Sequence, residues 1–559
     1  MARQLTLFVA APLLAGSLWC QSQPLPNVEQ GFGQIRPEAL RAHVQFLADD
    51  ALEGRGTGTR GFELAAKYVR SQFQAEGLKT GTQDGSYFQK VALRHTDVDA
   101  DATSLMLESG GEKNRLIYNR DFVLLDTHAS PSGSVSAPVV FAGYGVTAPE
   151  LGYDDYARLD VKGKIVVVFF FEAPATFPVT ERAYYMDHHV KREIARAHGA
   201  IGMIEISTPQ TEERFPWVAL LREVKIGYNS LSWLDSNQQP FGLDNQILAS
   251  AVLSRSGATA LFARERHTLE ELFAMAKSGK VDSFQLSKSL QLSYKARHTP
   301  VDSMNVVGVL PGSDPSLRKE YVVFSAHLDH LGIGPPVDGD SIYNGALDNA
   351  AGSSVLLVVS QFLAALPTPP RRSIVFLAVT GEEQDLLGSQ CFARASPLDG
   401  PIVANINVDG GAFLFPVKDV TAIGEEHSSL GPLARLAAEK TGFEVSAEYF
   451  PEEGYFIRSD QYSFIQTGVP SIFIDLGFKA VQAGVDPLAE MKKWNVTKYH
   501  SPKDDASQPI DYETSARFSR FAALLTYLTA NDTQRPTWNP NDFFGKRFCT
   551  QSAVCPSTP

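Results

Sequence analysis

Apolar positions in the second half of the chain fall into short continuous runs, separated by longer segments with helical spacing of apolar residues. A run without polar alternation predicts a strand buried on both faces, and such strands are typical of mostly parallel sheets covered by helices. The expected strands are residues 321–326, 373–379, 403–408 and 471–476, and the expected helices are residues 353–366, 430–440 and 512–528. We therefore predict an α/β fold with a mostly parallel mixed sheet flanked by helices.

The first half of the chain has a different pattern. Amphipathic helices are expected at residues 37–48 and 62–75, and the glycine-rich loop between them, residues 52–58, lacks the spacing of a dinucleotide-binding loop. Short β-like runs broken by Gly, Pro and Asp-Asp turns then predict a compact β-rich domain inserted into the main one. The expected division is a leader (1–22), a main domain in two parts (23–130 and 291–530), the inserted domain (131–290) and a tail (531–559).

The first residues have the pattern of an export signal. Arg3 precedes an apolar stretch, residues 5–18, that is too short to span a bilayer comfortably, and a polar segment ends it. We expect a secreted or periplasmic protein. A lipid anchor at Cys20 is the weaker alternative, because Trp19 is bulky where lipoprotein signals usually have a small residue. No later segment is long and apolar enough to predict stable membrane insertion.

Composition narrows the function classes. A chain of 559 residues with 44% hydrophobic and 20% charged residues predicts a folded protein with more than one core. A formal charge of −13 without a cluster of Lys and Arg argues against nucleic-acid binding. Cys549 and Cys555 either form a disulfide, as an exported protein allows, or remain free thiols, and Cys391 is expected to be a small core residue.

Side chains that bind metals follow the ends of the predicted strands. They are His327, Asp348, Glu382, Glu383, Asp409 and His500. In sheets of this kind ligands bind beyond the carboxyl ends of the strands. Imidazoles mixed with carboxylates suit zinc, and two such ions that share a carboxylate hydrolyse amide bonds. Each motif alone has an ordinary reading, such as a helix N-cap for Asp348, but together they predict a metal site.

Two further roles follow from local spacing. In an extended chain, residues two apart point the same way, so the carboxylate of Asp329 is expected to accept a hydrogen bond from the far nitrogen of His327. His330 then points to the other side and is given no role. Glu382 and Glu383 diverge from adjacent positions, so that one can hold a metal while the other faces the attacking water.

The motifs SAHLDHLG (325–332), GDSIYNG (339–345), EEQDLLGS (382–389) and YHSPKD (499–504) resemble those of the M28 family of co-catalytic zinc peptidases. Asp385 and Leu347 stand where family members commonly have Gly and Asp, and neither position is a ligand. The segments FAGYGV (141–146), DDY (154–156) and VKGKIV (161–166) resemble a protease-associated domain, which would be the inserted region.

The resemblance implies an exported metallo-exopeptidase with two zinc ions, most closely an aminopeptidase acting on peptides, and we expect a monomer. One zinc would be held by His327, Asp348 and Asp409, and the other by Asp348, Glu383 and His500. Glu382 would be the general base, supported by Asp329, and the Asp348–Asn349 peptide bond would be cis. Tyr499 or Tyr462 either donates to the oxyanion or packs, and Arg458 either binds a substrate carboxylate or, preferably, pairs with Asp460.

Other functions stay open on the sequence. A carboxypeptidase or dipeptidase of the same family differs only in whether the site binds a free α-carboxylate or a free α-amine. A single-zinc glutaminyl cyclase fits less well, because both histidines and Asp409 are retained. A non-catalytic binding ectodomain is disfavoured by the complete ligand set. The inserted domain is expected to overhang the site and limit substrate size.

Overall fold

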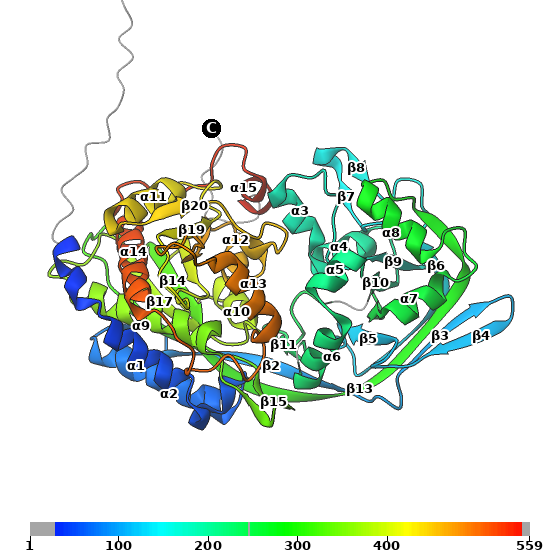
Figure 1. Ribbon diagram of the computed structural model, residues 1–559, viewed down its shortest axis with the longest axis horizontal. Coiled ribbons are helices and arrows are strands. Elements are labelled where there is room, and N and C mark those ends of the chain that lie inside the picture. The colour runs from blue at the N-terminus through cyan, green and yellow to red at the C-terminus, as the bar shows by residue number, and fades with distance from the viewer. Residues whose placement is uncertain (1–27, 228, 244–245, 550–559) are drawn as a thin grey trace, which may run out of the picture.

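The computed structural model describes residues 28–227, 229–243 and 246–549, so the leader and Cys20 lie outside the described residues. Figure 1 shows two lobes side by side. The lobe drawn on the left contains the first two helices and most of the C-terminal half, and the lobe on the right contains the middle of the chain. One long strand, β13 (Phe284–Leu310), runs from one lobe into the other along the lower side of the molecule.

The larger lobe is built on a mixed sheet. Its four central strands run parallel, in the order β17 (Ser373–Val379), β14 (Tyr321–His327), β18 (Ile402–Val408) and β21 (Ser471–Leu476). Beyond β17 the sheet continues antiparallel through β13 to β1 (Lys79–Thr80), β2 (Phe88–Val98) and β11 (Leu231–Trp233). Beyond β21 it continues to β19 (Asp419–Ile423), which is antiparallel to β21, and to β20 (Glu444–Ser446), which is parallel to β19. Every residue of the four central strands except Asp475 is buried, and the predicted mostly parallel mixed sheet is confirmed.

Helices cover both faces of this sheet. One face packs against α1 (Pro37–Leu47), α2 (Arg60–Ala75), α9 (Ala351–Ala364), α11 (Leu430–Thr441) and α14 (Tyr512–Asn531), and the other against α10 (Leu387–Arg394) and α12 (Gln461–Ile465). Within the described residues, one helical stretch, Ala346–Ala364, is long and apolar enough to cross a membrane. That stretch is 89% buried inside the protein, as expected of a core helix in a sheet covered on both sides.

The smaller lobe has a sheet of its own. Its strands follow the order β4 (Glu112–Leu116), β3 (Ser104–Ser109), β13, β6 (Ser132–Phe141), β9 (Ile165–Phe169), β10 (Gly202–Ile206), β12 (Ser250–Leu253) and β5 (Phe122–Leu125). Its helices are α3 (Val179–Met186), α4 (His188–Ala197), α5 (Pro209–Arg214), α6 (Trp217–Ile226), α7 (Arg255–Phe262) and α8 (Leu269–Ser278). The sheet includes β3 to β5, although the predicted insertion begins only at residue 131. Four of the five residues of β4 are exposed, so its sequence does not have the apolar pattern of a buried strand.

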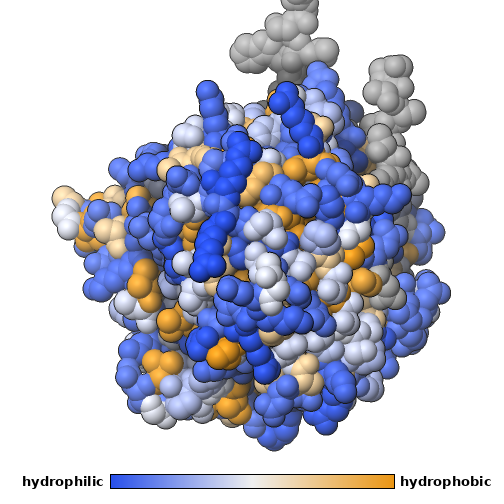
Figure 2. Space-filling view, turned by 90° about the vertical axis from the view of Figure 1, so that its right-hand side faces the viewer, coloured by the Kyte–Doolittle hydropathy of each residue, from blue (hydrophilic) through white to orange (hydrophobic). Residues whose placement is uncertain are grey.

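The two lobes share more than a strand. One hydrophobic cluster combines Phe141 and Tyr184 of the smaller lobe with Phe456 and Phe473 of the larger lobe and Phe544 of the C-terminal helix α15 (Phe543–Phe548). On the outer face of the smaller lobe, by contrast, hydrophobic residues lie scattered among hydrophilic ones (Figure 2). The two lobes therefore share one buried hydrophobic cluster where they meet.

The remaining elements are mostly short. They are η1 (Glu29–Gln34), η2 (Asp50–Arg55), β7 (Thr147–Ala148), η3 (Pro149–Leu151), β8 (Tyr153–Asp154), β15 (Gly332–Val337), β16 (Asp340–Tyr343), η4 (Ala346–Ala350), η5 (Tyr455–Ile457) and α13 (Pro487–Thr497). The glycine-rich loop forms η2, in which Glu53, Gly54 and Arg55 have positive φ. A Cβ at Gly54 would come within 2.5 Å of the Gly332 carbonyl oxygen, so the glycine permits this close approach.

Candidate metal centre

The proposed ligands meet beyond the carboxyl ends of the parallel strands. His327 is the last residue of β14, Asp409 directly follows β18, and Glu383 lies in the turn after β17. Asp348 is in the turn η4, which leads into α9, and His500 follows α13. Parallel strands deliver their ends to one edge of a sheet, so residues separated by as many as 173 positions become neighbours here.

Asp348 lies between the two histidines. Its Oδ1 is 3.3 Å from His327 Nε2, and its Oδ2 is 3.4 Å from His500 Nε2. Asp409 Oδ1 is 3.1 Å from His327 Nε2, and Glu383 Oε2 is 3.2 Å from His500 Nε2. The five side chains thus form two groups, each with one imidazole and one carboxylate of its own, which share Asp348. Each group offers the imidazole and carboxylate ligands that a divalent ion such as zinc takes.

His330 also belongs to this site, although the sequence prediction gave it no role. Its Nδ1 is 2.6 Å from Glu383 Oε1, and the side chain is fully buried. Side chains alternate between faces only in extended chain, and β14 ends at His327, so alternation does not determine where His330 points. The structure therefore places a third imidazole against the proposed ligand Glu383.

The prediction for the carboxylate of Asp329 is wrong in its details. His327 Nδ1 lies 3.1 Å from the main-chain oxygen of Asp329, so the carbonyl, and not the carboxylate, accepts its hydrogen bond. The carboxylate accepts instead from the main-chain N–H of Glu382 at 3.2 Å and from the hydroxyl of Thr57 at 2.9 Å. Asp329 consequently holds the backbone of Glu382, while its carbonyl fixes the tautomer of His327 with Nε2 facing the site.

The turn that carries Asp348 is held from two sides. The carboxylate of Asp504 accepts hydrogen bonds from the main-chain N–H groups of Leu347 and Asp348, each at 3.0 Å. The side chain of Asn349 donates to the carbonyl of Val408 and accepts from the N–H of Gly410, which links this turn to the end of β18. The Asp348–Asn349 peptide bond is cis, as the family resemblance implies.

Arg55, from the glycine-rich loop, ties several of these loops together. Its guanidinium donates to the carbonyls of Leu47, Leu328, Asn344 and Gly345. The side chain is only 1% exposed, and burial lowers its pKa to about 10. The contacts connect the chain just after His327 with the chain just before Asp348, so Arg55 fixes the distance between two proposed ligands.

The electrostatics of the site favour positive charge. Although burial opposes it, the carboxylates of Asp409 and Glu382 raise the pKa of His327 well above the usual range, and Tyr499, followed by Glu383, does the same for His500. Burial, followed by the charges of Asp409 and Glu383, raises the pKa of Glu382. Buried carboxylates need neighbouring positive charge, and His500 Nε2 is buried without a hydrogen-bond partner. Two imidazoles and several carboxylates that converge in this way fit zinc ions well.

The remaining residues predicted near the site have different positions. The ring of Tyr499 stacks on His500 with centroids 3.8 Å apart, so Tyr499 lies beside the proposed ligands. Tyr462 is buried in the hydrophobic cluster shared by the lobes, which agrees with the alternative that it packs. The predicted pair of Arg458 with Asp460 is wrong, because Arg458 Nη1 is 3.2 Å from Glu453 Oε2 while the carboxylate of Asp460 points into the interior beside His327.

Two of the cysteines, Cys391 and Cys549, lie within the described residues. Cys391 is buried in the core, and burial raises its pKa to about 12, as expected of an unreactive thiol. Cys549 is disulfide-bonded. Cys555 lies outside the described residues, so its pairing with Cys549 stays a prediction.

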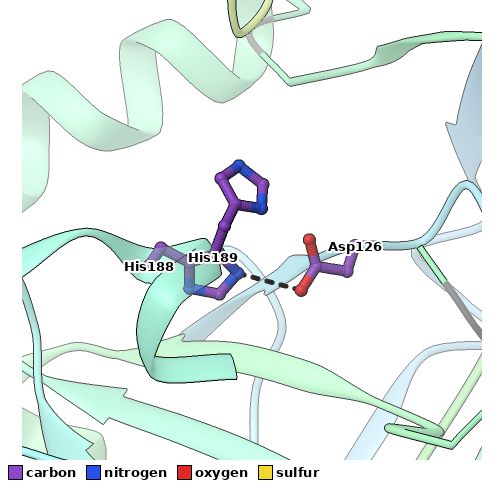
Figure 3. A group of neighbouring side chains, drawn as sticks. All are labelled: Asp126, His188 and His189. Carbon is purple, nitrogen blue, oxygen red and sulfur yellow. Dashed lines mark hydrogen bonds and ion pairs between the residues drawn. The ribbon is translucent and has the colours of Figure 1, made fainter. Parts of the chain in front are cut away.

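A second group of potential ligands, Asp126, His188 and His189, lies in the smaller lobe (Figure 3). His188 Nε2 is 2.9 Å from Asp126 Oδ2, and its Nδ1 is 2.7 Å from the carboxylate of Glu205. Arg192 Nε is 3.3 Å from the same oxygen of Asp126. Because both ring nitrogens of His188 face carboxylates and a guanidinium is already present, these residues form an ion-pair network rather than an open metal site.

Glu223 is another residue near the site that the sequence did not predict. It belongs to α6 of the smaller lobe, and its Oε1 is 3.3 Å from His500 Nδ1. No local pattern singles it out, because it is one charged residue on an amphipathic helix far from the other site residues in the sequence. Only the packing of the two lobes brings it to the site.

Comparisons with known proteins relate the part of the chain that carries these residues to a peptidase family. Residues 305–526, which hold all the proposed ligands, match the model of peptidase family M28. A probable zinc metalloprotease of Pyrenophora tritici-repentis is 27% identical over 265 residues, which are 43% of this chain and 59% of that protein. Aminopeptidase YwaD of Bacillus subtilis is 24% identical over 254 residues, 44% of this chain and 49% of that one. The chain thus spans only about half the length of these curated relatives.

The whole fold also has a counterpart among solved structures. An aminopeptidase from Aneurinibacillus sp. strain AM-1 superposes with a TM-score of 0.52 at 18% sequence identity. The match covers 92% of this chain and 99% of that one. The likeness therefore includes both lobes, and at this identity it concerns the fold.

Proposed function

The chain carries a peptidase family M28 domain over residues 305–526, and from this premise we propose that it is a zinc aminopeptidase with two metal ions. The observation that supports two ions is the position of Asp348, whose two oxygens lie 3.3 and 3.4 Å from the Nε2 atoms of different histidines. A carboxylate with one oxygen directed to each of two ligand groups is suited to bridging. His327 and Asp409 would complete one metal position, and Glu383 and His500 the other.

The chain's own residues would divide the chemistry of amide hydrolysis between them. When bound, zinc ions lower the pKa of water and polarise the scissile carbonyl. Glu382 would act as the general base, because burial and neighbouring carboxylates raise its pKa toward the range in which a carboxylate readily accepts a proton. It would then pass that proton to the leaving amine. The carboxylate of Asp329 would hold Glu382 in place by accepting a hydrogen bond from the main-chain N–H of Glu382. The hydroxyl of Tyr499 would donate a hydrogen bond to the oxyanion.

An aminopeptidase is preferred to a carboxypeptidase because acidic groups dominate the site. Besides burial, the charges of Asp409 and Asp460 contribute to raising the pKa of Glu382, and Asp409 also contributes to raising that of Asp460. Such surroundings favour a substrate's α-ammonium over its α-carboxylate. Arg458, the residue considered for binding a carboxylate, is paired with Glu453.

Metal content measured together with substrate preference tests this proposal. We expect two equivalents of zinc per chain, cleavage of aminoacyl nitroanilides, and little cleavage of dipeptides whose amino group is blocked. Removal of metal by a chelator should abolish cleavage, and added zinc should restore it. One equivalent of zinc would favour a cyclase-like single-metal site, and faster cleavage of the blocked peptides would favour a carboxypeptidase.

Export is part of the proposal. The sequence pattern of the first residues supports it, and a disulfide at Cys549 agrees with an oxidising compartment. The test is fractionation of the cells that make the full chain, with N-terminal sequencing of the mature protein. Recovery of activity only from the cytoplasm, with residue 1 retained, would contradict export.

A further inference from the structure

The carboxylate of Glu223 contacts the far side of a proposed metal ligand. Its Oε1 lies 3.3 Å from His500 Nδ1, and the two side chains are 23% and 7% exposed. The opposite ring nitrogen, Nε2, faces Asp348 and Glu383 and has no hydrogen-bond partner of its own. The imidazole of His500 is thus held between the metal position on one side and a carboxylate of the smaller lobe on the other.

The helix that carries Glu223 is fixed against the larger lobe. Near its C-terminal end, Ile226 packs so closely on Gly334 of β15 that a Cβ at that glycine would lie 2.9 Å from the isoleucine side chain. Just after the helix, the main-chain N–H groups of Ser230 and Leu231 donate to the side chain of Gln384 at 3.1 and 3.3 Å. Gln384 adjoins the ligand Glu383, so the position of Glu223 is set by contacts at the site itself.

The other proposed histidine ligand is held differently. His327 Nδ1 donates to the main-chain carbonyl of Asp329, two residues along the same loop. A carbonyl in the same loop orients the ring wherever the loop is folded. For His500 the equivalent acceptor comes from α6, more than 270 residues earlier in the chain. The two metal positions therefore differ in what supports them.

We propose that Glu223 is a positioning residue for His500, through which the smaller lobe completes one of the two metal positions. The inference rests on the proposed function. A carboxylate that accepts the Nδ1 proton selects the tautomer with a free lone pair on Nε2 and makes that nitrogen a stronger ligand. The position that uses Glu383 and His500 depends on this contact, whereas the position that uses His327 and Asp409 does not.

Zinc affinities of the full chain and of Glu223 variants test the inference. Metal-free wild-type protein, Glu223→Gln and Glu223→Ala are titrated with zinc in competition with a chromophoric chelator. We expect one of the two affinities to fall by about 10- to 100-fold in Glu223→Ala, the usual loss for a missing partner of a metal-bound histidine. Glu223→Gln should lose less, since its amide oxygen still accepts the proton, and the other affinity should stay at its wild-type value in both.

A matched variant separates this role from a general effect. Glu213→Gln removes the same charge from an exposed position on the preceding helix α5, and it should bind zinc like the wild type. Thermal unfolding of the metal-free variants shows whether they fold. If Glu223→Ala does not fold, Glu223→Gln still tests the inference.

The outcomes are distinguishable. Wild-type protein that binds no zinc tightly would overturn the proposed function. Two wild-type affinities in folded Glu223→Gln and Glu223→Ala would overturn the role of Glu223 and leave the function standing. An equal loss at both metal positions would also overturn it, because it would indicate a general structural effect.

Discussion

Glu382 is the residue whose replacement should separate proton transfer from metal binding. Glu382→Gln keeps the size of the side chain and removes its basicity. Because general-base catalysis typically contributes about 10²- to 10⁴-fold, we expect kcat to fall by about that factor. Zinc content should not change, since the proposed ligands are untouched. The measurement is kcat on an aminoacyl nitroanilide together with metal analysis of the same sample.

Glu439→Gln is a suitable control for that experiment, because it makes the same change at an exposed position on α11. A Glu382→Gln protein with both zinc ions and wild-type kcat would rule out Glu382 as the base. Loss of zinc along with activity would indicate that Glu382 is a ligand instead.

Arg55 should be among the most sensitive buried positions for stability. Arg55→Ala leaves four buried carbonyl groups without their donor, those of Leu47, Leu328, Asn344 and Gly345. Hydrogen bonds to charged groups contribute about 1.5–3 kcal/mol each, and their losses overlap, so the free energy of unfolding should fall by at least about 3 kcal/mol. Urea unfolding of the metal-free protein measures this change.

Arg60→Ala provides the comparison for Arg55. The side chain of Arg60 is 74% exposed, and its pair with Glu53 spans 3.8 Å. Such a surface pair contributes little, so the change should stay below about 0.5 kcal/mol. Similar effects of the two substitutions would contradict the role assigned to Arg55.

At the scale of elements, the apolar strands of the larger lobe could be predicted and the edges of the smaller lobe could not. The strands now labelled β14, β17, β18 and β21 were expected to within one residue of their bounds, because strands buried on both faces are apolar throughout. In β4, by contrast, four of five residues are exposed, so its sequence carries no strand pattern. It pairs with the preceding strand β3 across the turn at Gly110 and Gly111, so this pairing, and not burial of its own side chains, holds β4 in the sheet.

The same distinction explains the site. Residues such as His327 and Asp409 could be predicted because each follows a recognisable strand. Glu223 and Arg55 could not, since their role depends on which loop or lobe packs against them. The position of His330 could not be predicted either, because the chain beyond His327 is no longer an extended strand. Local pattern thus predicts ligands carried by strand ends, while the groups that support them require the tertiary structure.

The network around His188 joins three segments of the smaller lobe and should make its stability depend on pH. Although burial opposes it, Asp126 and Glu205 raise the pKa of His188 well above its ordinary value of 6.5. The charges of Arg192, Lys191 and His189 also face this network. Because the pKa of His188 is higher in the folded than in the unfolded protein, its ion pairs contribute fully to the free energy of unfolding below about pH 6.5. This contribution is lost as the pH rises through the folded-state pKa.

His188→Gln should therefore cost more at low pH than at high pH. Breaking a buried ion pair typically costs about 3 kcal/mol, which we expect near pH 6, with a clearly smaller cost near pH 9. Urea unfolding of the wild type and the variant at both pH values gives the difference. An equal cost at both would mean that His188 is neutral in the folded protein.

At the scale of the whole molecule, the shared hydrophobic cluster should make the two lobes unfold together. Phe141 and Tyr184 of one lobe and Phe456 and Phe473 of the other belong to the same buried cluster. Separate cores would give separate transitions, as is common for chains of this size. Here neither lobe can lose its core without exposing apolar surface of the other, so we expect one calorimetric transition.

Differential scanning calorimetry of the metal-free protein checks this expectation, because metal binding would otherwise stabilise one lobe selectively. The calorimetric and van't Hoff enthalpies should agree. Two resolved transitions would show that the joint contributes little to either core.

Because β13 belongs to both sheets, its length also fixes which side chains face the interior of each lobe. Lys295 is paired with Ser132 in the sheet of the smaller lobe, and the next residue, Ala296, is paired with Val98 in the sheet of the larger one. Side chains alternate between faces along a strand, so deleting a single residue at this crossing would turn one sheet's interior side outward, whereas deleting two would preserve the alternation. Chimaeras that exchange the inserted lobe between relatives should therefore tolerate length changes at this crossing in even numbers only.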